Sequence, residues 1–454
     1  MEDMKLEDSL DLSAVWLPFT NMKKFMTRPM VIRKASGPYV LDNEGRELFD
    51  CVSSLWHASV GHGPMEYIEK LVAYLHDGVS TGSLFGALNE PAIKYAMSLL
   101  DFIGEPHLKK VFFSNGGSDA VETALKLALQ YHYITGSGQD SIVYLKNAYH
   151  GVTMGALSAM GIGAYRTGYE GHLSKKFIPI ASPHCYRCEF SLQPTSCGLR
   201  CADQLEEVIA SSGGKIGALI MEPVQGAGGI IVPPEGYRSK IRDICSRHGI
   251  LLICDEVVTG MYRCGDKFAF QKDGLAPDIL VLSKAIGGGV MPLGVCVVAE
   301  KIYDAFEKGD HVFAHGNTCG GNPLSAMAGR IHLDRVSAPH FAGQVQRNAK
   351  RFADMLEDCR SIPIVGDVRY DGMMGALELV SDREQKTPLT DSATLAEWGR
   401  DAGLFLRPLG HVVSLLPPLN LTDEELDEMQ RRLKAFLQRA TANCATSERA
   451  AVAA

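Results

Sequence analysis

The sequence predicts an α/β protein with a large, mostly parallel sheet and helices on both of its faces, joined to a smaller α+β unit. Between about residues 105 and 300, short apolar runs alternate with stretches of helical periodicity, and the runs read KVFFS, SIVYL, IGALIM, ILLICD, DILVLS and GVCVVA. They are apolar at consecutive positions, which is typical of parallel strands buried on both faces. A chain of 454 residues has room for such a domain and a second one.

The pattern changes after about residue 335 to helices and glycine-punctuated strands, GMMGALELV and GLFLRPLGHVVSLLPP. Thr422 and Glu425 form a capping box at the start of a final helix, whose apolar face carries Leu426, Met429, Leu433 and Phe436. We therefore expect four parts. Residues 1–65 form an N-terminal segment that packs with the small domain, 66–335 form the large domain, 336–440 form the small domain, and 441–454 form a flexible tail.

Composition narrows the class of protein. Hydrophobic residues make up 46% and charged residues 22% of the chain, as in ordinary globular proteins. A net charge of -8 argues against a nucleic-acid or acidic-membrane partner. The uncharged run 285–299 contains Pro292 and is too short to span a membrane. The acidic N-terminus has no apolar region typical of a signal peptide. The twelve cysteines of the chain therefore predict a reduced, cytoplasmic protein.

Polar residues stand where three of the predicted strands end. Gly117 and Ser118 follow one strand and open a helix, an arrangement that either seats a phosphate or makes only a tight capped turn. Asp255 ends a second strand, where an acid either contacts a ligand or caps the following helix. Lys284 ends a third, where an ordinary lysine would extend its ammonium group to the surface.

These three features together are the parts needed to hold pyridoxal phosphate. A lysine amine forms an imine with the cofactor's aldehyde, a carboxylate keeps the pyridine nitrogen protonated, and a helix N-terminus receives the phosphate. The combination favours a site of this kind over the separate structural interpretation of each residue.

Six motifs occur in order along the chain: SNGGSDAVETALK, YHG, EPVQGAGG, CDEVVTG, LSKAIGGG and HGNTCGGNPL. On these motifs the chain resembles the class III aminotransferases, pyridoxal-phosphate enzymes of fold type I, over 16–418. The opening stretches VWLPFTNMKKF and LWHASVGHG are most similar to the ω-amino-acid:pyruvate and ω-amine transaminases of that class.

The resemblance implies a role for each matching residue. Lys284 would bind the cofactor covalently and move the proton, and Asp255 would pair with the pyridine nitrogen. Tyr149 and Val257 would enclose the ring. The remaining cofactor contacts would be Gly117, Ser118, His150, Glu222 and, on the phosphate of the neighbouring subunit of a homodimer, Thr318.

For the substrate, the resemblance places Phe19, Trp56 and Tyr149 in the pocket, with Phe85 entering from the partner subunit. Without it, such aromatic residues would be ordinary core. Arg407 matches the arginine that takes the carboxylate of the acceptor, a task that suits a planar guanidinium group; the alternative is an interface salt bridge.

One departure from the family narrows the acceptor. The glutamate-dependent members carry a glutamate after the EP motif, where this chain has only glutamine, glycine and alanine. The sequence therefore favours pyruvate over 2-oxoglutarate, in a ping-pong cycle with a primary amine or ω-amino acid as donor. A diaminopelargonate, polyamine or taurine transaminase is the alternative.

Four cysteines lie within seventeen residues, in CYRCEFSLQPTSCGLRC. Two short pairs of thiols suit zinc or an iron–sulfur cluster, so the pattern predicts a structural metal centre at Cys185, Cys188, Cys197 and Cys201. Reduced cysteines in a surface loop are the alternative. A non-enzymatic metal-binding module would explain neither Lys284 nor Asp255.

The segment GVSTG, 78–82, matches the pattern of a serine-hydrolase nucleophile elbow. That motif needs a buried strand before Ser80, whereas the preceding residues have helical spacing. We therefore expect no hydrolase site there.

Overall fold

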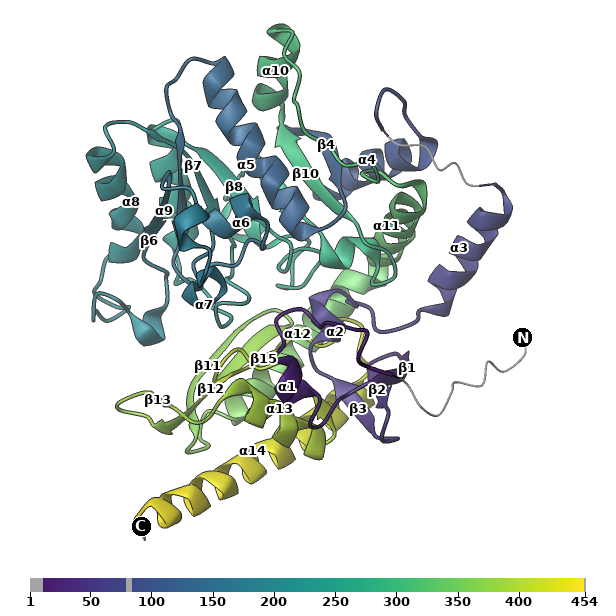
Figure 1. Cartoon of the computed structure of the whole chain (residues 1–454), viewed down its shortest axis with the longest axis vertical. Helices are drawn as coiled ribbons and strands as arrows, with labels where there is room; N and C mark the ends of the chain where they lie inside the picture. The colour runs from purple at the N-terminus through teal and green to yellow at the C-terminus, as the bar shows by residue number, and fades with distance from the viewer. Residues whose placement is uncertain (1–10, 79–83, 453–454) are drawn as a thin grey trace.

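The computed structural model describes residues 11–78 and 84–452, with side chains up to residue 444. Its centre is a seven-stranded sheet (Figure 1). In spatial order the strands are β4 (Leu108–Ser114), β10 (Gly294–Ala299), β9 (Ile279–Leu282), β8 (Leu251–Asp255), β7 (Ile216–Met221), β5 (Ser141–Leu145) and β6 (Phe177–Ile180). The predicted fold class is confirmed. The edge strand β6, with a proline in its four residues, was not among the predicted runs.

Burial on both faces explains the continuous apolar runs. In β9, Ile279 and Val281 belong to the apolar cluster on the face of α5, whereas Leu280 and Leu282 belong to the cluster on the opposite face. The first face is covered by α5 (Gly117–Ile134) and α10 (Glu300–Lys308), and the second by α4 (Glu90–Ile103), α8 (Arg200–Ser211), α9 (Tyr237–Arg247) and α11 (Pro323–Val336).

The sheet is parallel from β6 to β9, and β10 runs antiparallel to both of its neighbours. The carboxyl ends of β8 and β9 consequently meet at one edge. Because Asp255 ends β8 and Lys284 follows β9, this topology alone brings the two residues close together.

Two smaller sheets lie together below the large one (Figure 1). One contains β1 (Ile32–Ser36), β2 (Tyr39–Asp42), β3 (Glu47–Asp50) and β14 (Leu404–Phe405). In it, β14 pairs in parallel with β3, and Leu404 lies opposite Phe49. The other contains β11 (Val365–Asp371), β12 (Met374–Asp382), β13 (Thr387–Pro388) and β15 (Val412–Leu415).

The remaining helices connect these sheets or lie against them. They are α1 (Met22–Phe25), α2 (Ser53–Trp56), α3 (Met65–His76), α6 (Met154–Ser158), α7 (Gly163–Arg166), α12 (Pro339–Asp358), α13 (Ser392–Asp401) and α14 (Asp423–Val452). The residues before GVSTG form α3, as expected, and 79–82 of that segment lie outside the described residues. Within the described parts of the chain, no helix combines the length and apolar character of a membrane span.

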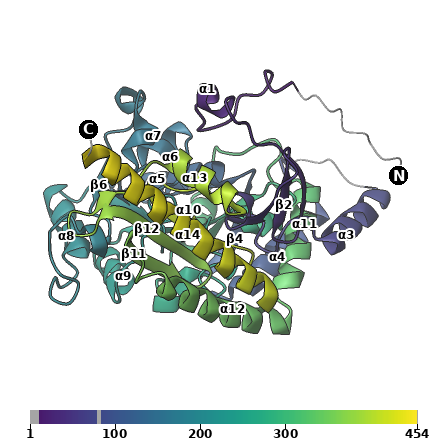
Figure 2. The ribbon, with the colours of Figure 1, turned by 90° about the horizontal axis from the view of Figure 1, so that it is seen from below.

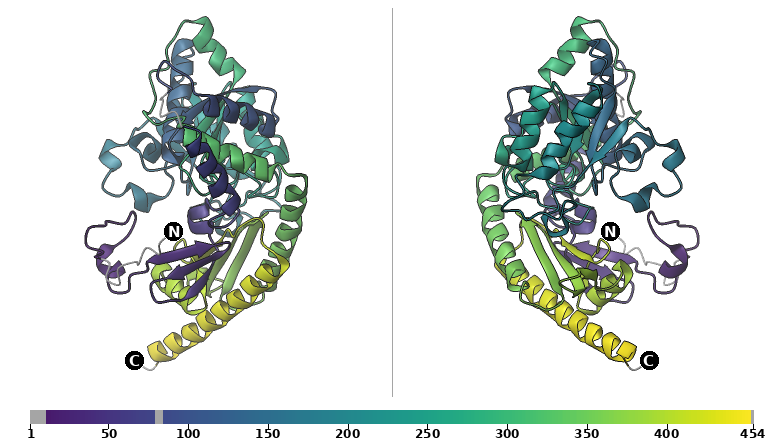
Figure 3. Two further views of the ribbon diagram at one scale, coloured as in Figure 1. Left: turned by 90° about the vertical axis from the view of Figure 1, so that its right-hand side faces the viewer. Right: turned by 90° about the vertical axis from the view of Figure 1, so that its left-hand side faces the viewer.

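The final helix α14 runs along the underside of the small sheets (Figures 2 and 3). The capping box is confirmed, because the Glu425 amide donates to Thr422 Oγ1 at 3.2 Å and the Thr422 amide donates to Glu425 Oε2 at 2.8 Å. The helix continues to Val452, into the segment from residue 441 that the sequence predicts as a flexible tail. The alanine-rich segment there has high helix propensity.

Replacing Phe436 in α14 by alanine is expected to lower the free energy of unfolding by about 3–5 kcal/mol, because its fully buried ring would leave a cavity. The matched change Lys434→Ala, at a half-exposed side chain of the same helix, is expected to change it by less than about 1 kcal/mol. Urea denaturation followed by far-UV circular dichroism measures both. Equal effects of the two changes would contradict this account of α14.

Candidate active site

A cavity of about 130 Å³ lies beyond the carboxyl ends of β8 and β9. Nine of the residues expected at the site line it: Trp56, Gly117, Ser118, Tyr149, His150, Glu222, Asp255, Val257 and Lys284. Gly151, Ala227 and Val258 complete the lining. The structure therefore gathers residues from six separate parts of the sequence around one space.

Lys284 begins a tight 3-10 turn, 284–287, directly after β9. Protein surrounds its side chain, which keeps only partial exposure at the cavity. Burial lowers the pKa of the Lys284 amine, although the carboxylates of Asp255 and Glu222 act against this shift. The amine is therefore more readily deprotonated than that of an ordinary lysine, and a deprotonated amine is a nucleophile.

Gly288 follows this turn and permits its shape. Its φ is +66°, in the left-handed region, and a Cβ atom there would lie 2.8 Å from a ring carbon of Tyr67. A larger residue at this position would therefore displace the turn that carries Lys284.

Asp255 and His150 form a buried pair, with 2.8 Å between Oδ2 and Nδ1. The other oxygen of Asp255 accepts from the amide of Val257 at 3.1 Å. The second ring nitrogen of His150, Nε2, is buried and has no hydrogen-bond partner. A buried polar atom of this kind is normally satisfied by a ligand or water.

Glu222 joins two chain segments at the cavity. Its Oε1 accepts from the amide of Tyr149 at 2.9 Å and its Oε2 accepts from the amide of Gly226 at 2.8 Å. Burial, together with the charge of Asp255, raises the pKa of Glu222 to about 7, against the opposing effect of His150 and the two amides. Glu222 is therefore placed as a support that holds backbone.

The N-terminus of α5 faces the same cavity. Its N-cap is Gly116, so no side chain occupies the first amide groups of the helix. A Cβ atom on Gly117 would lie 3.3 Å from Val257, and one on Gly151 would lie 2.4 Å from Ser118 Oγ. These glycines leave open a helix N-terminus, which is a favourable position for an anion.

Trp56 reaches the cavity from a strained segment. The φ angles of Ser53, Ser54 and Trp56 are +46°, +62° and +63°, and such conformations persist only when neighbouring groups hold them. The buried carboxylate of Asp50 does so by accepting from the amide of Ser54 at 2.5 Å and by pairing with His62 Nε2 at 2.7 Å.

Sequence reasoning did not identify Asp50 and His62. The available signal was the acid that ends the run ELFD, which is separated by four residues from the aromatic motif LWHASVGHG.

The comparisons with known proteins agree on one family. The model of the family Aminotransferase class-III matches residues 21–437. A relative from Geobacter sulfurreducens, an adenosylmethionine-8-amino-7-oxononanoate aminotransferase, is 38% identical over 92% of this chain and 94% of its own length. An omega-aminotransferase from Caulobacter vibrioides is 32% identical over 94% of this chain and 98% of its own. The chain belongs to the class III aminotransferases.

Solved structures agree with this assignment. An amine transaminase from an uncultivated Pseudomonas species, in its PLP-bound form, has a TM-score of 0.89 and 37% identity, covering 96% of this chain and 100% of its own. An omega transaminase from Pseudomonas jessenii, in complex with PMP, has a TM-score of 0.90 and 27% identity, covering 95% of this chain and 97% of its own.

The residues around the cavity fit pyridoxal phosphate. The unpartnered Nε2 of His150, the uncapped N-terminus of α5 and the buried amine of Lys284 offer a polar contact, an anion seat and a nucleophile. Pyridoxal phosphate needs a nucleophile for its aldehyde and an anion-binding position for its phosphate.

Four residues expected at the site lie outside the cavity lining. Phe19 is exposed, but its ring centre lies 5.1 Å from that of Tyr165, which lies 5.8 Å from that of Tyr149 in the cavity wall. Arg407 is half-buried, and its charge acts on both Lys284 and Tyr149. Both residues thus approach the cavity from outside, and Tyr165 is a contact that the motifs did not indicate.

Phe85 and Thr318 lie elsewhere. Phe85 is 69% exposed and lines a separate cavity of about 840 Å³, together with His315 and Asn317. Thr318 is exposed. The segment before it packs on α5, where His315 Nε2 contacts Thr123 Oγ1 at 2.9 Å.

The four cysteines do not support a metal centre. Across 11–78 and 84–452, no group of three or more histidine, cysteine or acidic side chains could hold a metal ion. Burial raises the pKa of the Cys201 thiol to about 11 and also raises that of Cys185. Cys188 and Cys197 are free thiols as well. The prediction of zinc or an iron–sulfur cluster is therefore not supported, although Cys185, Cys188, Cys197 and Cys201 line one small cavity.

In the apo protein, Lys284 is expected to react with formaldehyde and borohydride at lower pH than an ordinary lysine, because burial lowers its pKa and leaves the amine neutral earlier as the pH rises. Lys308 is the comparison, since its exposed ammonium pairs with Asp304 and its pKa is raised. Peptide mass spectrometry across a pH series measures both. Identical pH midpoints would contradict the lowered pKa of Lys284.

Proposed function

We propose that this class III aminotransferase is an ω-transaminase, which moves an amino group from a primary amine or ω-amino acid to pyruvate in a ping-pong cycle. The observation that carries the proposal is the Lys284 amine, buried at a cavity with aromatic walls and within electrostatic reach of Arg407. An amine pocket with one cation at its edge suits a donor without a carboxylate near its amino group and an acceptor with one.

Bound pyridoxal phosphate would supply a conjugated ring that withdraws electrons from the substrate carbon. Lys284 would hold it covalently, Asp255 would face its ring nitrogen, and Tyr149 and Val257 would flank the ring. The phosphate would rest on the amides of Gly117 and Ser118, with Thr318 acting on the neighbouring subunit of a homodimer. The exposure of Thr318 and Phe85 is consistent with such a shared site.

The side chains at the cavity would transfer the proton, orient Asp255 and exclude water. The lowered pKa of Lys284 leaves Nζ free to take a proton from the substrate carbon and return it. The contact with His150 orients Asp255. Trp56 is only 6% exposed and closes one side of the cavity to water.

The turn after Glu222 supports pyruvate as acceptor. The sequence 223–231 contains no acid that would neutralise Arg407. Its one polar side chain, Gln225, is buried and committed elsewhere, because it contacts Ser182 Oγ and donates to the carbonyl of Lys146 at 2.9 Å. Arg407 therefore remains available to a substrate carboxylate.

An engineered neighbour bears on the same pocket. One solved omega transaminase carries substitutions of a tryptophan, a phenylalanine and an arginine and was engineered for asymmetric synthesis of enantiopure bulky amines. Trp56, Phe85 and Arg407 are residues of the same three types.

A second function is favoured by the relatives. Several are adenosylmethionine-8-amino-7-oxononanoate aminotransferases, at up to 38% identity over more than nine-tenths of this chain. That reaction uses the same lysine chemistry with a larger donor and acceptor, so the two functions differ in substrate and share the site.

An amine panel tests the function. The holoenzyme is expected to form alanine from pyruvate with 1-phenylethylamine or β-alanine as donor and to form little glutamate from 2-oxoglutarate, because Arg407 has no carboxylate to gate it. Lys284→Ala is expected to lose at least about 10³-fold in turnover. Product chromatography decides. Exclusive turnover of S-adenosylmethionine with 8-amino-7-oxononanoate would select the second function.

Arg407→Met is expected to raise KM for pyruvate about 30-fold, through the loss of about 2 kcal/mol of charge-assisted hydrogen bonding, and to change KM for an uncharged amine less than twofold. Arg383→Met, at an exposed arginine that binds backbone carbonyls of 360–363, is the control and should change neither constant. Steady-state kinetics with each substrate varied in turn provides the measurement. An equal rise in both KM values would exclude a specific role in acceptor binding.

A further inference from the structure

The turn 225–231 separates the candidate active site from the small sheet of β11 and β12. Backbone hydrogen bonds close it, because the amide and carbonyl of Gln225 pair with those of Ile231 at 3.1 and 2.9 Å. The amide of Ile230 also donates to the carbonyl of Gly226 at 3.0 Å. One residue of the turn, Ala227, lines the cavity that contains Lys284.

The active-site side of this turn is held by Glu222 and Trp56. The Gly226 amide donates to Glu222 Oε2 at 2.8 Å, and a Cβ atom on Gly226 would lie 3.5 Å from the Trp56 ring. The buried side chain of Ile230 belongs to the same apolar cluster as Trp56. A displacement of the turn would therefore move the wall that a bound amine meets.

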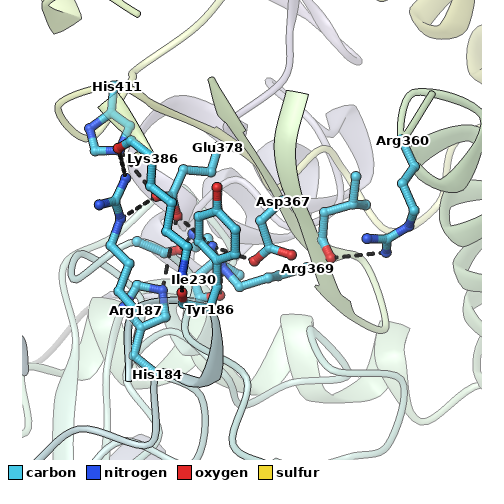
Figure 4. Close-up of polar contacts among 12 residues, drawn as sticks. His184, Tyr186, Arg187, Ile230, Arg360, Asp367, Arg369, Glu378, Lys386 and His411 are labelled. Carbon is cyan, nitrogen blue, oxygen red and sulfur yellow. Dashed lines mark hydrogen bonds and ion pairs between the residues drawn. The ribbon is translucent and has the colours of Figure 1, made fainter. Parts of the chain in front are cut away.

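The opposite side of the turn is held by one arginine of β11 (Figure 4). Arg369 donates through Nη2 to the carbonyl of Gly229 at 2.7 Å and through Nε to the carbonyl of Ile230 at 3.1 Å. The φ of Ile230 is +52°, an unfavourable conformation for a β-branched residue. Two donors from one rigid guanidinium fix both peptide groups at this strained point.

Arg369 is itself fixed by carboxylates. Its Nη1 lies 2.7 Å from Asp367 and 2.6 Å from Glu378 Oε2, and its side chain is 9% exposed. Glu378 on β12 is 1% exposed and also binds Arg187 Nε at 2.5 Å and His411 Nε2 at 3.2 Å. Burial alone would raise the pKa of Glu378, but these donors hold it well below its usual range, so the carboxylate stays ionised.

We propose that Arg369, held by Glu378, is a positioning residue for the amine substrate. It fixes the turn 225–231 as one wall of the pocket, and the wall sets the affinity for the amine and the largest amine that fits. This inference rests on the proposed function, because it assigns a substrate effect to the same site. Nothing in the family motifs indicates Arg369, which lies just before the expected strand GMMGALELV.

Arg360 provides a matched control on the same part of the molecule (Figure 4). It ion-pairs with Glu357 at 2.6 Å and donates to the carbonyl of Val368, in β11, at 3.3 Å. The Arg360 side chain contacts Glu357 and the carbonyl of Val368, away from the turn. A general effect of removing a guanidinium group from this sheet would therefore appear in the variants of both arginines. An effect on the pocket would appear only in the Arg369 variant.

The test compares Arg369→Lys with Arg360→Lys in the holoenzyme. Lysine keeps the positive charge beside Asp367 and Glu378 and loses the planar pair of donors to the turn. For Arg369→Lys we expect KM for the amine to rise about tenfold with kcat within twofold, and kcat/KM for a bulky amine to rise relative to a small one. For Arg360→Lys we expect all three quantities to stay within twofold. Glu378→Gln should shift KM in the same direction as Arg369→Lys, and the double variant should shift it by less than the product of the two effects.

A second readout needs no turnover. Release of the turn is expected to expose the Trp56 indole to water, so the emission of the apo protein should shift to longer wavelength in Arg369→Lys. The shift should be absent when Arg369→Lys is combined with Trp56→Phe. This measurement is independent of the substrate and of the cofactor.

The inference is overturned if Arg369→Lys matches the wild type or Arg360→Lys in KM and in emission, or if kcat falls while KM is unchanged. If Arg369→Lys does not fold, Glu378→Gln and its emission spectrum decide by the same criteria. A wild-type protein that transfers no amino group from any amine of the panel would refute the proposed function instead, and the emission test would still report on the turn.

Discussion

The burial of one amine determines the arrangement around it. A lysine at the end of a fully buried strand loses the hydration that keeps an ammonium group charged, and the pKa of Lys284 falls accordingly. Two carboxylates, Asp255 and Glu222, oppose that fall, so the site balances desolvation against attraction. Each carboxylate needs its own partners to stay in place: His150 for one and two backbone amides for the other. The polar lining of the cavity follows from these requirements.

The backbone around the cavity is unusually constrained, and its supports come from outside the motifs. Trp56 and Ile230 both have left-handed φ angles and share an apolar cluster. Asp50 supports the first segment from the β3 strand, and Arg369 supports the second from β11. Strain of this kind is common at functional sites because the surrounding structure, rather than local preference, determines the conformation.

Much of the fold could be predicted because strands buried on both faces leave a continuous apolar signal, and parallel strands bring their carboxyl ends together. The sequence therefore predicts that Asp255 and Lys284 lie at the same edge of the sheet. The contact of Arg369 with the 225–231 turn could not be predicted, because it joins residues about 140 positions apart that carry no shared pattern. The Cys185–Cys201 segment was misleading for a different reason: its local spacing predicts a metal site, and the four cysteines do line one cavity, but they do not form a group that could hold a metal ion.

The pairing of β3 with β14 also bears on how the chain is made. Phe49 lies opposite Leu404, so the first sheet is missing one strand until about 350 further residues have been synthesised. At roughly 5–20 residues per second, that interval is on the order of 20 to 70 s. During it, the edge of β3 that β14 later covers is open to other strands. Timing on the ribosome and protection by chaperones therefore matter for the N-terminal segment of this chain.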